Sequence, residues 1–186
     1  MAGPIVCEQS NLVAVNEYVS VFMDDVVFPD GITGTHLRVD EPTGGAAVLV
    51  VDGNGRIYLH KVFRYATGQE HLEIIRGFGD SEDKSLMETA MRELQEECGF
   101  AFEVTEDPVE LGYVYANSSL LSSRVLLVFV CVHPTRKKVT DGMERPHGGS
   151  WVTVGELLTL VASGEMEDGF TMAALLRAVS LGLVVF

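Results

Sequence analysis

Positive charge is scarce in this sequence. Lysine and arginine together number 13 among 186 residues, against 27 aspartates and glutamates, and the formal net charge at pH 7 is −14. Surfaces that bind nucleic acid or anionic membranes nonspecifically are matched by Lys and Arg. The composition therefore argues against both kinds of partner. It still allows phosphate-bearing small ligands, provided that divalent cations mediate the contact.

Cysteines and long apolar runs are also few. The three cysteines, Cys7, Cys98 and Cys131, are odd in number and lack metal-ligand spacing, and the last two lie in apolar patterns typical of buried thiols. The longest apolar stretches, VLLVFVCV and VSLGLVVF, are too short to span a bilayer. The N-terminal segment MAGPIVCEQSN lacks the basic and apolar regions of a secretory signal. We therefore expect a reducing, cytoplasmic location.

The rest of the composition is typical of a folded globular protein, with 47% hydrophobic and 22% charged residues. Loosely alternating polar and apolar residues around the turn PDGITG predict a small N-terminal β lobe over residues 1–42. Strand-like and helix-like segments are interspersed over residues 43–186. This order predicts an α/β or α+β main domain with a mixed sheet covered by helices.

The clearest helix is predicted from Ser85 to Cys98. Ser85 followed by Glu88 forms a capping box, and Gly99 stands where a C-terminal glycine is common. At about 100° per residue, the apolar side chains fall on one face, which should pack against the sheet. That face comprises Met87, Ala90, Met91, Leu94 and Cys98.

Three carboxylates, those of Glu93, Glu96 and Glu97, share another arc of this helix, roughly 100° wide. Like charges at these spacings destabilise a helix by roughly a few tenths of a kcal/mol per pair. Charge alone favours a solvated acidic face, which is common in a protein this acidic, over a site for a hard cation, which prefers oxygen ligands. The residues around the cluster decide between the two.

The segment RELQEECGF satisfies R-E-U-x-E-E-x-G-U, where U is bulky and apolar, and so resembles the second half of the Nudix box, G-x5-E-x7-R-E-U-x-E-E-x-G-U. The first half departs from that pattern. Strict spacing puts Phe78 at the glycine and Lys84 at the glutamate. One extra residue in the loop would make Gly77 the box glycine, but we find no shift that recovers the glutamate.

The resemblance extends to FPDGITGTHLRV, AAVLVVDGNGRIYLHKVFRYATG, HLEIIRGFGD and GEMEDGFTMAALLRA, in the order found in Nudix hydrolases of the ADP-ribose pyrophosphatase group. It implies an α/β/α sandwich that hydrolyses the pyrophosphate of ADP-ribose or a related nucleotide sugar with Mg²⁺ or Mn²⁺. That group commonly pairs through its N-terminal strands, so a homodimer is expected.

Position by position, the resemblance implies a metal site on the predicted helix. Glu93, Glu96 and Glu97 match the metal-binding carboxylates, and Arg92 matches the arginine that orients them. The backbone carbonyl of Arg76 resembles a further metal ligand. Among these site residues, Arg92 and Glu93 are also expected to be catalytic.

Substrate binding and proton transfer are expected to involve other segments of the chain. Arg64 in FRYATG matches an arginine that contacts the substrate, and Glu73 in LEIIRG matches a glutamate near the metals. In the ADP-ribose pyrophosphatase group, the general base is often a glutamate on a loop late in the chain. Here the loop TDGMERPHGGS offers Asp141, Glu144 and His147, of which we choose Glu144.

Lys84 poses the main question about activity. The box glutamate that it replaces normally forms a salt bridge with the arginine, and a lysine would repel both Arg92 and the cations. Glu88, one turn before Arg92, is the expected substitute partner. Three hypotheses remain: a nucleotide-sugar hydrolase, a domain that binds the nucleotide sugar without hydrolysing it, and a hydrolase of dinucleoside polyphosphates or nucleoside triphosphates.

Overall fold

The computed structural model describes residues 3–137 and 148–185. The chain divides into two compact units. One comprises Met1–Gly44 with Tyr115–Arg124, and the other comprises Gly45–Val114 with Val125–Phe186. The sequence did not indicate that the segment 115–124 would join the N-terminal residues.

The smaller unit is a three-stranded antiparallel sheet, in the order β1 (Val6–Val15), β2 (Ser20–Val27) and β3 (Thr33–Asp40). β1 is an edge strand and is exposed along nearly its whole length. The segment from residue 115 to 124 attaches to β3, since Val39 accepts a hydrogen bond from the Ser122 amide at 3.0 Å.

The larger unit is built on an eight-stranded sheet with the central order β11-β5-β4-β10-β8. β4 and β10 run parallel and the other pairs are antiparallel, so the sheet is mixed, as expected. Its strands are β4 (Gly45–Asp52), β5 (Ile57–Arg64), β6 (Gln69–Glu73), β7 (Ile75–Phe78), β8 (Phe100–Val104), β9 (Val109–Val114), β10 (Val125–Lys137) and β11 (Gly149–Val152).

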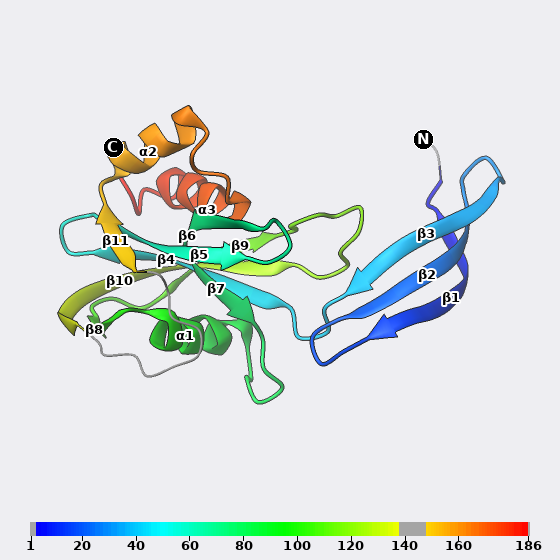
Figure 1. Ribbon diagram of the computed structural model, residues 1–186, viewed down its shortest axis with the longest axis horizontal. Helices are drawn as coiled ribbons and strands as arrows, with labels where there is room; N and C mark the ends of the chain where they lie inside the picture. The colour runs from blue at the N-terminus through cyan, green and yellow to red at the C-terminus, as the bar shows by residue number, and fades with distance from the viewer. Residues whose placement is uncertain (1–2, 138–147, 186) are drawn as a thin grey trace. The chain divides into compact units, whose positions relative to one another are not determined.

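Helices cover both faces of this sheet (Figure 1). On one face, α1 (Leu86–Glu97) packs through Ala90, Leu94 and Cys98. On the other face lie α2 (Val154–Ser163) and α3 (Gly169–Ser180). The expected α/β/α sandwich is therefore confirmed. Among the described residues, no helix is long and apolar enough to cross a membrane.

The sheet splits between its two central strands. β4 and β5 pair at a single position, Val51 with Ile57, and then diverge. β6 continues along β5, and β7 continues along β4. Because β6 and β7 follow one another in the chain, the link at Ile74 crosses the split. The side chains next to this link line the candidate site.

Local sequence explains where α1 begins and ends. The Ser85 hydroxyl accepts a hydrogen bond from the Glu88 amide at 3.2 Å, which caps the first turn. The helix ends at the C-cap Cys98, which has an extended conformation. Gly99 does not adopt a positive φ, so our expectation of a left-handed glycine cap was wrong here. A left-handed glycine cap does occur at Gly164, after α2, with φ 80°.

Candidate active site

The guanidinium of Arg92 organises the carboxylates of α1. Its Nη1 donates to Glu93 at 2.8 Å and to Glu96 at 3.0 Å. Its Nη2 donates to the backbone carbonyl of Phe78 at 2.9 Å, which ties the helix to the end of β7. Arg92 thus contacts two of the three clustered carboxylates, Glu93 and Glu96.

Asp83, and not Glu88, forms the salt bridge with Arg92 from the loop before the helix. Asp83 accepts from Arg92 Nη2 at 3.0 Å and from Thr89 Oγ1 at 2.8 Å. Arg92 accordingly holds the pKa of Asp83 at about 2, below its usual 3.8. Glu88 instead accepts a hydrogen bond from the Lys84 amide at 2.9 Å. Our expectation that Glu88 would pair with Arg92 was therefore wrong.

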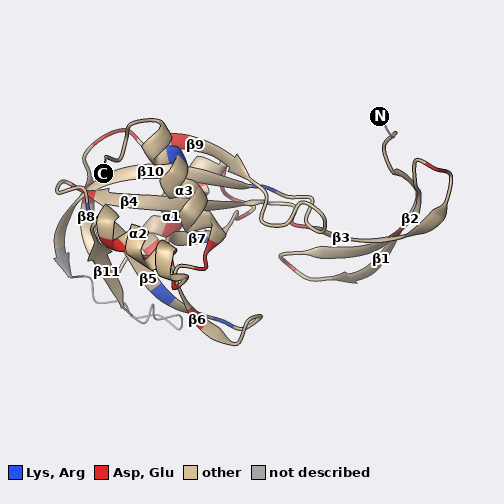
Figure 2. Ribbon diagram, turned by 90° about the horizontal axis from the view of Figure 1, so that it is seen from above, with Lys and Arg blue, Asp and Glu red and all other residues tan. Residues whose placement is uncertain are grey.

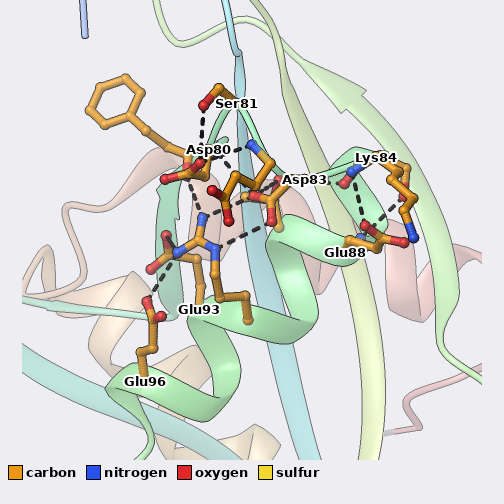
Figure 3. A network of polar contacts seen from close by, with 12 residues as sticks. Asp80, Ser81, Asp83, Lys84, Glu88, Glu93 and Glu96 are labelled. Carbon is orange, nitrogen blue, oxygen red and sulfur yellow. Dashed lines mark hydrogen bonds and ion pairs between the residues drawn. The ribbon is translucent and has the colours of Figure 1, made fainter. Parts of the chain in front are cut away.

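Figure 3 shows the separation between the two groups of residues. Asp83, Glu93 and Glu96 lie on one side of the start of α1, whereas Lys84 and Glu88 lie beside each other on the other side. The physical reason is geometric, because the backbone amide of Lys84, just before the N-cap Ser85, lies within hydrogen-bonding reach of the Glu88 carboxylate in the first turn. Lys84 is exposed and does not take the position of the box carboxylate.

The sequence contained a signal for Asp83 that our spacing argument missed. With Gly77 as the box glycine, five residues separate it from Asp83, which therefore takes the acidic position of the box, so that G-x5-D replaces G-x5-E. The extra residue then falls between Asp83 and Arg92. Allowing aspartate as well as glutamate at that position would have found it.

Gly77 permits the close approach of α1 to β7. A Cβ atom built on Gly77 would overlap the carboxyl group of Glu93. Only a glycine therefore lets this carboxylate lie against the backbone of β7. Glu93 itself is buried, and burial raises its pKa above the usual value although Arg92 opposes the rise.

Glu97 lies one turn further along α1. Its side chain is 31% exposed, but its Oε2 atom is buried. Burial, together with the nearby charge of Glu93, raises the pKa of Glu97 to about 7. A carboxyl group in such surroundings remains half protonated near neutral pH unless a cation balances its charge.

A chain of ion pairs crosses the split in the sheet. The fully buried carboxylate of Glu73 accepts from Arg64 Nε at 2.7 Å and also pairs with Arg76. Arg76 in turn lies 3.4 Å from Asp168, the N-cap residue of α3, and above the ring of Phe170. Glu73 thus holds both arginines at the site, and 37% of the Arg64 side chain remains exposed to a ligand.

Unsatisfied polar atoms mark the same place. Among the described residues, the buried side-chain nitrogen and oxygen atoms without a hydrogen-bond partner belong to His60, Arg76 and Glu97, together with Oε2 of Glu73, whose contact is the ion pair with Arg76. Buried polar groups are nearly always hydrogen-bonded, because an unmade bond costs about 1–3 kcal/mol. Their concentration beside one helix end and one sheet split indicates a position that a polar ligand completes.

Comparison with known proteins agrees with this geometry. A family model described as the NUDIX domain matches residues 41–175, which is most of the chain. The chain belongs to the Nudix family. Among solved structures, the crystal structure of an ADP compounds hydrolase is similar over 97% of this chain and 95% of its own, with a TM-score of 0.77 and 21% sequence identity. That identity establishes a shared Nudix fold. No curated protein sequence matches the chain.

Nudix hydrolases act on small nucleotide substrates and generally use divalent cations, and the residues present fit such an ion. Glu93 and Glu97 supply the oxygen donors that Mg²⁺ and Mn²⁺ prefer, and the buried Oε2 of Glu97 lacks a partner. Within the described ranges, no three acidic, histidine or cysteine side chains already form a complete metal site. Substrate oxygens and water would therefore complete the coordination.

Two sequence predictions about this Nudix site remain as they were. Glu144, the expected base, lies outside the described residues. The backbone carbonyl of Arg76 stays a predicted metal ligand, and the backbone of Arg76 opposes the rise in the pKa of Glu97 that burial causes.

Proposed function

We propose that this Nudix protein hydrolyses the pyrophosphate bond of ADP-ribose or a related nucleoside diphosphate sugar, with Mg²⁺ or Mn²⁺. The observation that carries the proposal is the joint placement of Glu93, which Arg92 holds, and of Glu97 opposite the Glu73–Arg64 pair. Such a site offers anionic ligands for cations and an arginine for the phosphates. The likeness to an ADP compounds hydrolase over nearly the whole chain supports the substrate class.

The residues divide the work of the reaction. A bound divalent cation would neutralise the pyrophosphate oxygens and lower the pKa of the attacking water. Glu93, Glu96 and Glu97 bind the cations, and Arg92 keeps the first two in position. We assign Arg76 to the same site through its backbone carbonyl.

In this proposal the substrate binds at the split in the sheet. Arg64 presents its guanidinium to a phosphate group, and Glu73 fixes that guanidinium through its 2.7 Å hydrogen bond. Glu144 accepts the proton of the attacking water in this proposal. With ADP-ribose as substrate the products are AMP and ribose 5-phosphate.

A binding module without hydrolysis is the alternative of a different class. This hypothesis was supported by Lys84, which occupies the glutamate position when the strict spacing of the Nudix box is applied. Asp83 supplies a carboxylate to Arg92 in spite of that lysine, which favours the hydrolase. A hydrolase for dinucleoside polyphosphates or nucleoside triphosphates is a second alternative within the same chemistry.

Turnover with purified protein separates these functions. ADP-ribose, a dinucleoside polyphosphate and a nucleoside triphosphate should each be incubated with Mg²⁺ or Mn²⁺, and the products quantified by ion-exchange chromatography. We expect AMP from ADP-ribose at the highest kcat/KM, with the Glu97→Gln variant as the inactive control. Binding of ADP-ribose by calorimetry with no AMP formed would show that the protein is a binding module.

We also propose that the protein is a homodimer joined through its N-terminal sheet. Four apolar side chains on the edge strand β1 are more than half exposed: Val6, Leu12, Val13 and Val15. An unpaired edge strand with exposed apolar residues is a favourable surface for association. The double variant Leu12→Glu/Val13→Glu should therefore elute as a monomer in size-exclusion chromatography with light scattering. Leu176→Glu, at an exposed leucine of α3, is the matched control and should leave the mass unchanged.

A further inference from the structure

His60 is a buried histidine beside the proposed cation site. It lies in β5 opposite Glu73 of β6, with both side chains on the α1 face of the sheet. Its ring is 1% exposed, and Nδ1 lies 4.0 Å from Glu97 Oε2. Among the described residues, neither ring nitrogen has a hydrogen-bond partner, and neither does that glutamate oxygen.

Burial makes this arrangement costly for the fold alone. An unsatisfied buried polar group destabilises a protein by about 1–3 kcal/mol, and a leucine of similar size would avoid that cost. The neighbouring residues on the same side of the sheet, Tyr58 and Ile75, are part of an apolar core. A histidine at this position is therefore better explained by a ligand-dependent contact than by packing.

The geometry places that contact at Glu97. Burial lowers the pKa of His60 below its usual value, and an imidazole ring has at least one N–H donor in either protonation state. A separation of 4.0 Å is too long for a hydrogen bond, but a shift of about 1 Å would form one. Glu97 can make such a shift, because its side chain is partly exposed whereas the histidine is enclosed.

We propose that His60 is a positioning residue that orients Glu97 for cation binding by donating a hydrogen bond from Nδ1 to Oε2. The inference rests on the proposed function, since it takes Glu97 to be a metal ligand. Groups behind metal ligands fix the orientation of those ligands and typically contribute about 10–100-fold in metal affinity. Contacts of this kind are often long in the free protein and shorten when the site is occupied.

The test measures Mn²⁺ binding directly, by isothermal titration calorimetry without substrate, together with the melting temperature in EDTA. His60→Leu keeps the volume but removes the donor, so we expect Mn²⁺ affinity to fall about 10–100-fold while the melting temperature in EDTA stays the same or rises. His60→Asn keeps an amide donor near the position of Nδ1, and it should restore affinity to within a few-fold of wild type. Leu59→Val, on the same strand but facing the other core, should lower the melting temperature without changing Mn²⁺ affinity.

Several results would overturn the proposal. They are wild-type Mn²⁺ affinity in His60→Leu, equal weakness of His60→Asn and His60→Leu, or a loss of affinity in Leu59→Val as large as in His60→Leu. Glu97→Gln separates this failure from that of the proposed function. If Glu97→Gln loses Mn²⁺ while His60→Leu retains it, the role of His60 is wrong and the cation site stands. If Glu97→Gln also binds Mn²⁺ as wild type does, the cation site itself is misplaced.

Discussion

Replacing Asp83 by asparagine should weaken both the cation site and the fold. Asp83 accepts hydrogen bonds from Arg92, from the Thr89 hydroxyl and from the Asp80 amide, at 3.0, 2.8 and 2.9 Å. A bond to a charged group contributes about 1.5–3 kcal/mol and a neutral one about 1 kcal/mol, so the loss should be about 1–2 kcal/mol. For a protein of this size that corresponds to a melting temperature lower by about 2–8 °C.

The effect on function follows from the arginine. Arg92 without Asp83 is free to leave Glu93 and Glu96, so Mg²⁺ affinity measured by calorimetry should fall by about 10–100-fold. Arg92 holds the pKa of Asp83 at about 2. The contribution of the Asp83 carboxylate to stability is therefore complete above pH 4 and is lost as the pH falls towards 2.

Glu88→Gln is the matched control for this experiment. It alters a carboxylate of the same helix start that contacts the Lys84 amide and not Arg92, so Mg²⁺ affinity should stay within about two-fold of wild type. The reasoning is refuted if Glu88→Gln costs as much Mg²⁺ affinity as Asp83→Asn, since Glu88 would then be the functional partner of the arginine.

Three further predictions concern Glu97 and Gly77. Glu97→Gln should lower kcat by at least about 100-fold in steady-state assays, since even residues behind metal ligands contribute 10–100-fold; a near-normal rate would remove Glu97 from the site. Burial raises the pKa of Glu97 to about 7 from 4.5, so its contribution to stability is present below pH 4.5 and is lost as the pH rises through 7. Urea unfolding in EDTA should show this decline in stability with pH. Mg²⁺ in place of EDTA, or the Glu97→Gln substitution, should reduce it. An unchanged slope of stability against pH in the variant would assign the decline to other groups. Gly77→Ala should displace Glu93 and lower both the melting temperature and Mg²⁺ affinity, whereas Gly53→Ala, in an open turn, should change neither.

The local patterns of the chain were sufficient for the main elements. The apolar positions of α1, together with Ser85 at its start, predicted a helix whose Ala90 and Leu94 face the sheet, and the structure confirms both. Periodicity and capping act over a few residues, so the sequence expresses them directly. The edge strand β1 lies within the predicted N-terminal β lobe, but neither it nor β8 was recognised as a separate strand, because neither has strong alternation and each pairs with a neighbouring strand.

The sequence by itself determined the class of fold, the acidic helix and the Nudix motif that identifies its carboxylates. The tertiary structure decided which carboxylate meets Arg92, because reach across a loop depends on backbone path and not on residue count. It also brought His60, Glu73 and Glu97 together, although they are distant in sequence. Their proximity arises where β4 and β5 diverge and α1 lies against β7, and a pairing of that kind depends on packing that no local pattern encodes.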